Sequence, residues 1–311
     1  MRVCLLSNVN VTRDASFWKY QFLTLAYASI SRPLNRRNRA PQPDYTPLAL
    51  SRSAFYEWKN KQLHWGHTNR EALAIRVREI FVEHRRRYGA RRIVHELRSI
   101  GVTCSRSKVS KIMGEMDLVA IQPRSFKPKT TSSRHRLGYS PNLLLSGIEL
   151  TRIDHVWVGD ITYIPLRNGF AYLSTLMDLF SRKIVGWSLE LTMTEELVMA
   201  TLKKAIASRQ PSPSLVHHTD RGGQYASKKY RALLSRGQMQ QSMSRAGDCY
   251  DNAFMESCFG TMKTELEMSG FDTCEHAHQE IREYINYYNS IRRHSSLEYQ
   301  SPTNFELSLL N

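Results

Sequence analysis

The sequence predicts an α/β domain in its C-terminal half, preceded by an all-α region. From about residue 153 onward, apolar or alternating segments of strand length are interleaved with helical patterns. Between residues 68 and 115, by contrast, apolar residues recur at helical spacing in three successive segments. With 311 residues, 41% of them hydrophobic, the chain is long enough for two domains with ordinary cores.

Residues 1–50 follow no clear pattern. An apolar and aromatic stretch at 17–30 gives way to a stretch rich in Pro, Arg and Asn at 32–47. Such a composition is typical of extended or disordered segments. We leave residues 1–50 unassigned and expect a poorly ordered extension, either a lineage-specific addition or the product of a start codon assigned too far upstream.

Within residues 51–120, a short helix is predicted at 53–59, and three longer helices follow it. The first begins at Thr68, which is followed three residues later by Glu in the spacing of a capping box, and it breaks near Gly89. The second covers 91–99 and the third 105–115. A helix, a Gly-containing break, a helix, a short turn and a helix describe a helix-turn-helix unit. We therefore expect a DNA-binding region here.

The distribution of charge supports this expectation. The chain has a net charge of +16, and residues 68–140 contain 17 Lys and Arg against 6 Asp and Glu, a local excess of 17 − 6 = 11. A basic cluster of this kind favours a polyanionic partner. Taken singly, each residue is as well explained as a solvated surface cation. The candidate DNA contacts are Arg91 and Arg92 near phosphates, and Arg106, Lys108 and Lys111 projecting from the third helix toward a major groove.

Composition also excludes several classes of protein. Five cysteines without a Cys-x-x-Cys pair argue against a disulfide framework and a structural zinc site. No apolar run approaches the roughly 20 residues of a membrane span, and the N-terminus is too polar for a signal peptide. We expect a cytoplasmic protein associated with DNA and not with a membrane.

The remainder divides into a basic linker at 121–152 and a catalytic domain at 153–311. Residues 122–142 combine Pro, Ser and basic residues without periodicity. In the domain, the predicted elements are strands at 155–165, 171–179 and 183–190, a helix at 194–208, a strand at 215–219, a helix at 224–234, a strand at 238–242 and helices at 251–268 and 280–288. Asp251 is the expected N-cap of its helix. Beyond the last helix, Arg292, Arg293 and His294 either contact DNA or belong to a segment that caps the domain.

Three acidic residues are candidates for a metal site. Asp160 interrupts an apolar strand, Asp220 ends a short apolar run, and Glu256 lies in a helix 256 − 220 = 36 positions later. Together they would form an all-oxygen site suited to Mg²⁺ or Mn²⁺. Each also has an ordinary explanation: a strand-end Asp bound to backbone N–H groups, a turn Asp before Arg-Gly-Gly, and an exposed helix acid.

Other polar residues compete for this role. Asp178, on a neighbouring strand, is the most serious rival, and we expect it to play a supporting role. His217 and His218 lack metal-ligand spacing and are interpreted as supporting or structural. The remaining rival acids are Glu195, Glu196, Asp248, Asp251 and Glu265.

At these residues the chain resembles a known family. Asp160 with Trp157 and the surrounding Asp-Ile-Thr-Tyr, together with Asp220 and Glu256, is similar to the catalytic core of insertion-sequence-3 family transposases, second-frame products within the retroviral-integrase-like superfamily. The resemblance covers about residues 51–307. Further matching segments are 178–187 (DLFSRKIVGW), 218–225 (HTDRGGQY), 251–256 (DNAFME), 288–297 (YNSIRRHSSL) and 301–306 (SPTNFE).

The resemblance implies an RNase H-like integrase core in which the first and fourth strands lie side by side. It implies a transposase of the Asp-Asp-Glu (DDE) polynucleotidyl transferase type, with Asp160, Asp220 and Glu256 as catalytic residues and ligands of Mg²⁺, for which Mn²⁺ may substitute. The residue at Lys263 is implied to contact DNA beside the cleaved bond. Implied partners are the terminal inverted repeats of a mobile element, target DNA, further copies of the chain on DNA, and an upstream-frame product fused to it or working with it. The zinc-binding head of retroviral integrases is absent from the sequence.

Two alternatives remain open at this stage. A non-catalytic remnant would bind element ends without cutting them, although the three intact acids argue against it. A structure-specific nuclease of the RNase H type would share the metal site but would not need the basic helix-turn-helix. It would cleave DNA without joining it.

Overall fold

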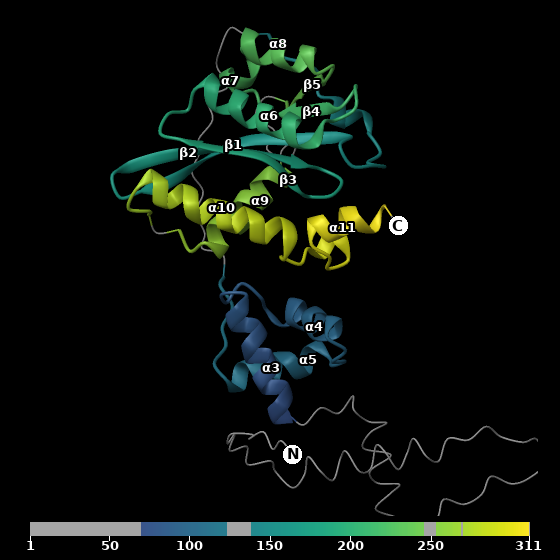
Figure 1. Ribbon diagram of the computed structural model, residues 1–311, viewed down its shortest axis with the longest axis vertical. Helices are drawn as coiled ribbons and strands as arrows, with labels where there is room; N and C mark the ends of the chain where they lie inside the picture. Colours follow the sequence, from purple (N-terminus) through teal and green to yellow (C-terminus); the bar gives the residue numbers. More distant parts are fainter. Residues whose placement is uncertain (1–69, 123–137, 246–252, 269, 311) are drawn as a thin grey trace, which may run out of the picture. The chain divides into compact units, whose positions relative to one another are not determined.

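The computed structural model describes residues 70–122, 138–245, 253–268 and 270–310 (Figure 1). Residues 68–311 belong to one compact unit. The predicted extension at 1–50, the short helix predicted at 53–59, the capping residue Thr68, most of the linker and the N-cap Asp251 all lie outside the described residues.

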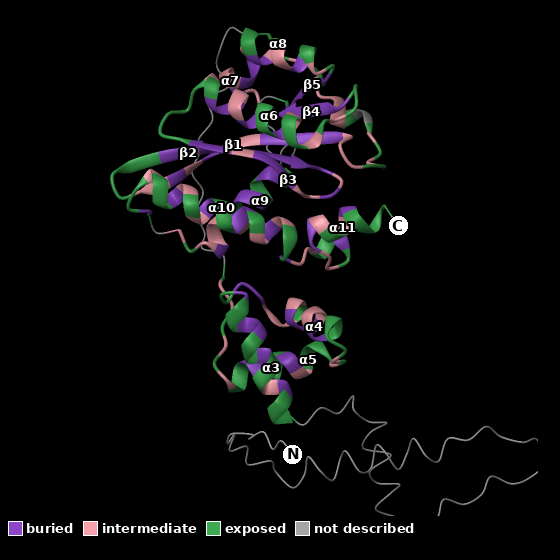
Figure 2. Ribbon diagram, in the orientation of Figure 1, coloured by how far each residue is buried: buried purple, intermediate pink, exposed green. Residues whose placement is uncertain are grey.

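Three helices, α3 (Arg70–Glu83), α4 (Ala90–Ser99) and α5 (Arg106–Glu115), form the first described part, as predicted. In Figure 2 each of them carries both buried and exposed residues, as expected for a small helical unit with one shared core. The side chain of Ser105 accepts the backbone N–H of Lys108 and so caps α5.

A five-stranded sheet with the order β3-β2-β1-β4-β5 forms the centre of the second part. Its strands are β1 (Val156–Leu166), β2 (Gly169–Asp178), β3 (Ile184–Glu190), β4 (Val216–Thr219) and β5 (Gln240–Met243). The first three strands are antiparallel neighbours, whereas β4 pairs in parallel with β1 and β5 in parallel with β4. The prediction that the first and fourth strands lie side by side is confirmed.

The pairing of β4 with β1 is short, and this positions the acids. The register ends at Gly159 opposite Thr219. The next residue of each strand, Asp160 and Asp220, therefore follows directly after the last paired position. Helix α9 (Ala253–Glu265) contacts β1 from one face of the sheet.

Helices cover both faces of the sheet (Figure 1). On one side lie α6 (Glu195–Arg209), α7 (Gly223–Ala226) and α8 (Lys228–Arg236), and on the other α9 (Ala253–Glu265), α10 (Cys274–Ser290) and α11 (Pro302–Ser308). Trp157 belongs to the core under α6, α7 and α8, whereas Val156 and Val158 belong to the core under α9 and α10. This is the alternation expected of a strand buried on both faces. Among the described helices, none combines the length and apolar character that a membrane crossing needs.

One helix prediction was wrong. The segment predicted as a single helix at 224–234 consists of α7 and α8, separated at Ser227. Ser227 has extended backbone angles, and its side chain accepts the backbone N–H of Tyr230, which starts a new helix. The serine N-cap interrupts an otherwise helical pattern.

The segment that immediately precedes β1, from residue 138 onward, packs against the sheet and its core. It includes the 3-10 helix η2 (Leu143–Ser146). The backbone N–H of Leu143 donates to the Ser242 hydroxyl at 2.9 Å, and that of Met243 donates to the Pro141 carbonyl at 3.2 Å. Leu144, Ile148 and Leu150 pack against the core under α9 and α10. This part of the predicted linker therefore lies against the α/β domain.

The basic residues after α10 form contacts within the protein. Arg292 is 4% exposed, and its Nη2 lies 2.7 Å from Oε1 of Glu265. Arg293 donates from Nη2 to Oε2 of Glu96 at 2.9 Å. Burial is the largest of the causes that lower the pKa of His294 to about 4. Of the two alternatives for this segment, its contacts favour the capping role.

Candidate active site

Asp160 lies in the middle of β1, at the first position that β4 does not pair. Its Oδ1 accepts a hydrogen bond of 2.8 Å from the backbone N–H of Ile161. Strand side chains alternate, so half-buried Asp160 is on the same face as Val158 and Ile164. Those residues pack against α9, so the carboxylate is directed toward that helix.

Asp220 follows β4 immediately and begins a tight turn. Its Oδ1 accepts the backbone N–H of Gly222 at 2.9 Å. A Cβ atom at Gly222 would lie 3.0 Å from the same oxygen, so glycine allows the backbone to approach the carboxylate closely. Asp220 therefore acts as the turn residue that its Arg-Gly-Gly context suggests. This does not prevent it from facing Asp160.

Glu256 and Lys263 belong to α9. Glu256 lies in its first turn and is exposed, and Lys263 lies in its last turn and is half-buried. Seven residues make about two turns, so the two side chains share a face about 10 Å long. The Nζ atom of Lys263 lies 4.1 Å from the ring centroid of Tyr163 in a cation–π contact.

The charges of Asp220 and Glu256 both act on the carboxyl group of Asp160. The pKa of Asp160 is raised well above its ordinary value, mainly by burial and next by the negative charge of Asp220. Glu256 raises this pKa further, whereas the Ile161 N–H and the Lys263 ammonium lower it. Burial lowers the pKa of Lys263, an effect that Asp160 opposes. The charges of Asp220, Glu256 and Lys263 therefore all act on Asp160.

The donors present suit a hard divalent cation. In the described residues no group of three or more His, Cys, Asp or Glu side chains is already arranged to hold a metal ion. The charges of Asp220 and Glu256 nevertheless disfavour the ionised form of Asp160. A bound cation would offset this repulsion. The oxygen-only donor set of Asp160, Asp220 and Glu256 fits Mg²⁺ or Mn²⁺ by its chemistry.

Asp178, the strongest rival acid, is fully buried and engaged in a turn. Its Oδ1 accepts the backbone N–H groups of Phe180 at 2.9 Å and Ser181 at 2.8 Å, and its Oδ2 accepts that of Asp154. These bonds hold the β2–β3 turn and tie it to the residues before β1. Among the other rivals, Glu195 binds Lys229 and Glu265 binds Arg292, while Asp248 and Asp251 lie outside the described residues.

The two histidines before Asp220 are internal. His217 and His218 are fully buried on β4. The Nε2 atom of His217 lies 2.7 Å from the Tyr230 hydroxyl, and Nδ1 of His218 lies 2.8 Å from that of Ser242. Burial is the main cause that lowers the pKa of His217 to about 3, so this ring is neutral at physiological pH. The contacts agree with the structural interpretation of the sequence.

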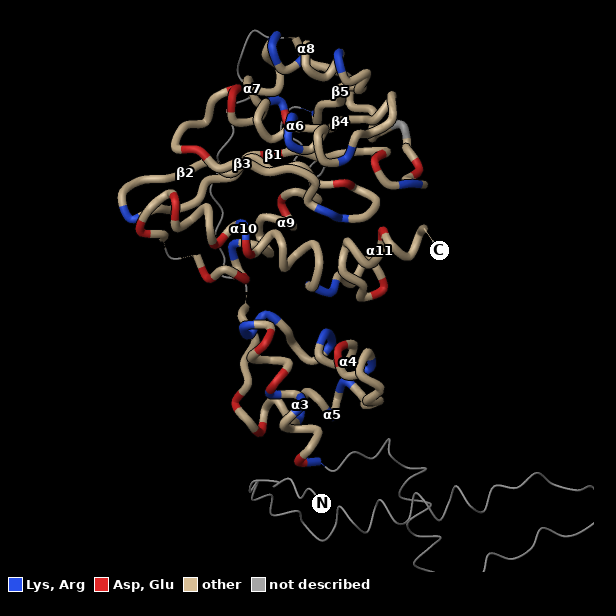
Figure 3. The backbone as a smooth tube through the Cα atoms, viewed as in Figure 1, with Lys and Arg blue, Asp and Glu red and all other residues tan. Residues whose placement is uncertain are grey.

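The candidate DNA contacts of the helical region differ in exposure. Arg91, Arg106 and Lys111 are exposed and Lys108 is half-buried. Figure 3 shows Lys and Arg distributed over α3, α4 and α5 together with acidic residues. Arg92, in contrast, places Nη1 3.5 Å from Oε1 of Glu265, and its guanidinium carbon lies 5.5 Å from the ring centroid of Tyr88. The Arg92 guanidinium therefore interacts with groups of the protein itself.

Sequence analysis missed the importance of Glu265, which it counted only as a rival acid. This side chain is 7% exposed and accepts hydrogen bonds from Arg292 and from the Tyr284 hydroxyl at 3.0 Å. It also lies beside Arg92. These partners come from α4, α10 and the loop after α10, and no local pattern signals the cluster.

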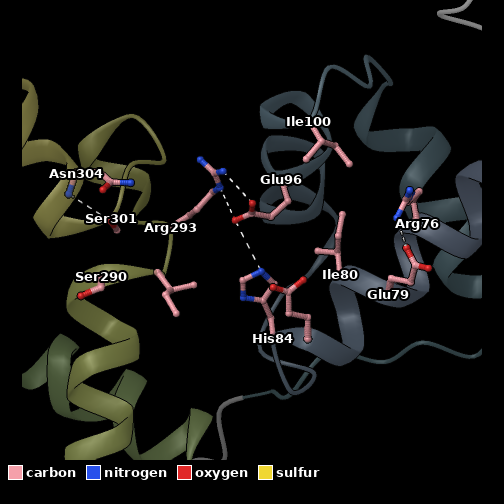
Figure 4. Close-up of a pocket in the computed structure, with 12 residues that line it drawn as sticks. Arg76, Glu79, Ile80, His84, Glu96, Ile100, Ser290, Arg293, Ser301 and Asn304 are labelled. Atoms are coloured by element: carbon pink, nitrogen blue, oxygen red, sulfur yellow. Dashed lines mark hydrogen bonds and ion pairs between the residues drawn. The ribbon is translucent and has the colours of Figure 1, made fainter.

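An open pocket of about 430 Å³ lies away from the three acids (Figure 4). His84 and Glu96 line it from one side, and Arg293 and Asn304 from the other. Figure 4 shows Arg293 pointing to Glu96 across it. The pocket contains no residue of the predicted catalytic set, and both of its arginines pair with carboxylates of its own lining, Arg76 with Glu79 and Arg293 with Glu96.

Comparison with known proteins gives the family. Residues 151–249 match the integrase core domain family, residues 237–302 match a second integrase core domain family, and residues 68–126 match an HTH-like domain family. The chain is 42% identical over 239 residues to a Lactococcus lactis transposase for insertion sequence element IS904, covering 76% of this chain and 94% of the relative. It is 35% identical over 263 residues to the Escherichia coli transposase InsF for insertion sequence IS3A, covering 83% of this chain and 91% of the relative.

Solved structures similar to this chain are viral integrases. One is the intasome of simian T-cell lymphotropic virus in complex with a PP2A regulatory subunit, with a TM-score of 0.43, 16% identity and coverage of 65% of this chain and 67% of that chain. Another is the HTLV-2 integrase catalytic core domain in complex with magnesium, with a TM-score of 0.41, 16% identity and coverage of 49% and 96%.

The HTH-like and integrase core matches identify a DNA-binding protein. By the extent and identity of its matches to transposases, the chain belongs to the insertion-sequence-3 family of transposases, whose integrase core is a polynucleotidyl transferase of the DDE type.

Proposed function

We propose that this transposase cuts one DNA strand at an end of its mobile element and joins the freed 3′-hydroxyl to another phosphodiester. The observation that supports this chemistry best is that Asp220 and Glu256 both raise the pKa of Asp160, while Lys263 lowers it. A divalent cation held by the three carboxylates would offset this repulsion.

Asp160, Asp220 and Glu256 would hold Mg²⁺, with Mn²⁺ as a substitute. Two such ions would supply Lewis-acid activation of a water or 3′-hydroxyl and stabilisation of the leaving oxygen. The chain itself would orient the reacting strand. Lys263, held against the Tyr163 ring, would bind the phosphate next to the cleaved bond.

The helical region would bring the chain to DNA. We propose residues 51–120 as the DNA-binding region and 153–311 as the catalytic domain, with the residues from 138 onward packed on the latter. Arg91, Arg106, Lys108 and Lys111 would contact phosphates or a major groove. Arg92 would hold the region together through Glu265. The chain would bind the terminal inverted repeats of the element and the target DNA. Several copies of the chain would act together on the DNA. The upstream-frame product would be fused to the chain or work with it.

A strand-transfer assay tests this function. Labelled duplexes carrying the element's ends are incubated with Mg²⁺ and either the full chain or its Glu256→Gln variant. We expect cleaved ends and joined products from the wild type and neither from the variant. Equal products from both proteins would discard the metal mechanism. Cleavage without joining would support a nuclease, and binding without cleavage a regulatory remnant.

A further inference from the structure

Arg182 stands apart from the other arginines of the α/β domain. It lies in the β2–β3 turn, within the segment 178–187 that resembles the family. It is half-buried, yet it forms no ion pair or hydrogen bond with the residues that the structure describes. Arg209, Arg292 and Arg293, by comparison, are all bound to carboxylates.

The guanidinium of Arg182 forms a cation–π contact with an aromatic ring. Its carbon lies 4.4 Å from the ring centroid of Phe254, the second residue of α9. Phe254 is 40% exposed, so the pair lies at the surface and not in the core. A guanidinium stacked on a ring keeps its N–H donors in the plane of the fork, available to an anion with several oxygens.

The guanidinium of Arg182 is partly removed from water. Burial lowers the pKa of Arg182, and the largest opposing influence is Tyr288, followed by Asp178. Both oxygens of that Asp178 accept backbone N–H groups. A partly desolvated cation without a bound anion is costly, and a phosphate would remove the cost.

We propose that Arg182 binds a backbone phosphate of the bound DNA. Lys263 forms a second cation–ring pair near the other end of α9. Phe254 and Lys263 are nine positions apart, about 14 Å along the helix but half a turn around it, so the two pairs lie on opposite flanks of α9. Arg182 would therefore bind a phosphate on the flank away from Glu256 and Lys263, which share a face. The inference rests on the proposed function for the identity of the ligand as DNA.

The test is equilibrium binding of the full chain to a fluorescent random-sequence duplex without metal, over roughly 50 to 200 mM salt. Arg182 has φ of 60°, a left-handed conformation that Asn and Gly tolerate, so Arg182→Asn and Arg182→Gly preserve the turn. Both variants should bind about tenfold more weakly at low salt and lose about 0.9 from the slope of log K against log salt. Arg182→Lys should keep the slope and lose part of the affinity, because it retains the charge but not the fork.

Lys203→Asn is the matched control. Lys203 is an exposed cation of α6, and its removal should change neither affinity nor slope. Wild-type binding by Arg182→Asn and Arg182→Gly would overturn the inference, as would an equal loss in Lys203→Asn. The assay contains no metal and measures no chemistry. Strand transfer by Glu256→Gln would therefore remove the proposed function alone, and an unchanged salt slope in the Arg182 variants would remove this site alone.

Discussion

Gly159 lies so close to Leu176 that no side chain fits between them: a Cβ atom at Gly159 would come within 2.6 Å of Cδ2 of Leu176. The same atom would lie 3.2 Å from Cε1 of His217. Gly159 precedes Asp160 and pairs with Thr219, the residue before Asp220. The absence of a side chain at Gly159 therefore leaves room for the side chains of Leu176 and His217, which lie beside it on the neighbouring strands.

Gly159→Ala should destabilise the protein by about 1–3 kcal/mol, because the added methyl group overpacks a buried strand. It should also lower the strand-transfer rate by displacing Asp160. Thermal unfolding and strand transfer measure the two effects. Gly114→Ala is the control, since a Cβ at this position in α5 has nothing within 4 Å. Unchanged stability of Gly159→Ala would contradict the packing described.

Glu265→Gln should cost about 3 kcal/mol of unfolding free energy. Arg292 is 4% exposed and would keep its charge without a carboxylate, and breaking such a buried pair is strongly destabilising. Glu79→Gln breaks only the exposed pair with Arg76 and should cost less than about 0.5 kcal/mol. Denaturant titration of both variants gives the comparison. Similar small losses in the two would show that the buried cluster adds little.

Asp160→Asn and Asp178→Asn should separate function from stability. The charge of Asp160 is disfavoured by burial and by Asp220, so removing it should raise the melting temperature without metal and abolish strand transfer. Asp178 holds the β2–β3 turn through backbone N–H groups, so its variant should lose about 1–3 kcal/mol of stability. A melting temperature lowered by Asp160→Asn would argue that this carboxylate is structural.

Stability should depend on pH through His217. Its pKa is about 3 in the folded protein against 6.5 unperturbed. The unfolded chain therefore binds more protons between these values, and stability should rise with pH from about 3 to 6.5, by up to about 1.4 kcal/mol per unit. His217→Gln removes this contribution. The difference in unfolding free energy between the two proteins should change across that window, and parallel pH profiles would refute the assignment.

Periodicity was sufficient to find the strands and most helices, because β1, β2 and β3 are long and apolar. It failed where a single side chain changes the backbone. Ser227 divides one predicted helix into two, and Thr273 starts α10 before its apolar spacing becomes visible. The polar residues at 274–279 give no helical signal of their own.

Motif and spacing single out the three candidate acids, whereas the long-range contacts of the basic residues could not be predicted from the sequence. Arg92 was expected at a phosphate, but it lies beside Glu265, 173 positions away in the sequence. Arg293 was left between two roles and pairs with Glu96, 197 positions away. Contacts of this range depend on how the elements pack, which no local pattern encodes.

The central claim is that Asp160, Asp220 and Glu256 share one divalent-ion site. Its most direct test is a Mn²⁺ titration of the full chain on a duplex with a pre-cleaved element end, followed by electron paramagnetic resonance. We expect Asp160→Asn, Asp220→Asn and Glu256→Gln each to weaken the same bound Mn²⁺ signal, while Asp178→Asn retains it. Wild-type Mn²⁺ binding in the three triad variants would contradict the account.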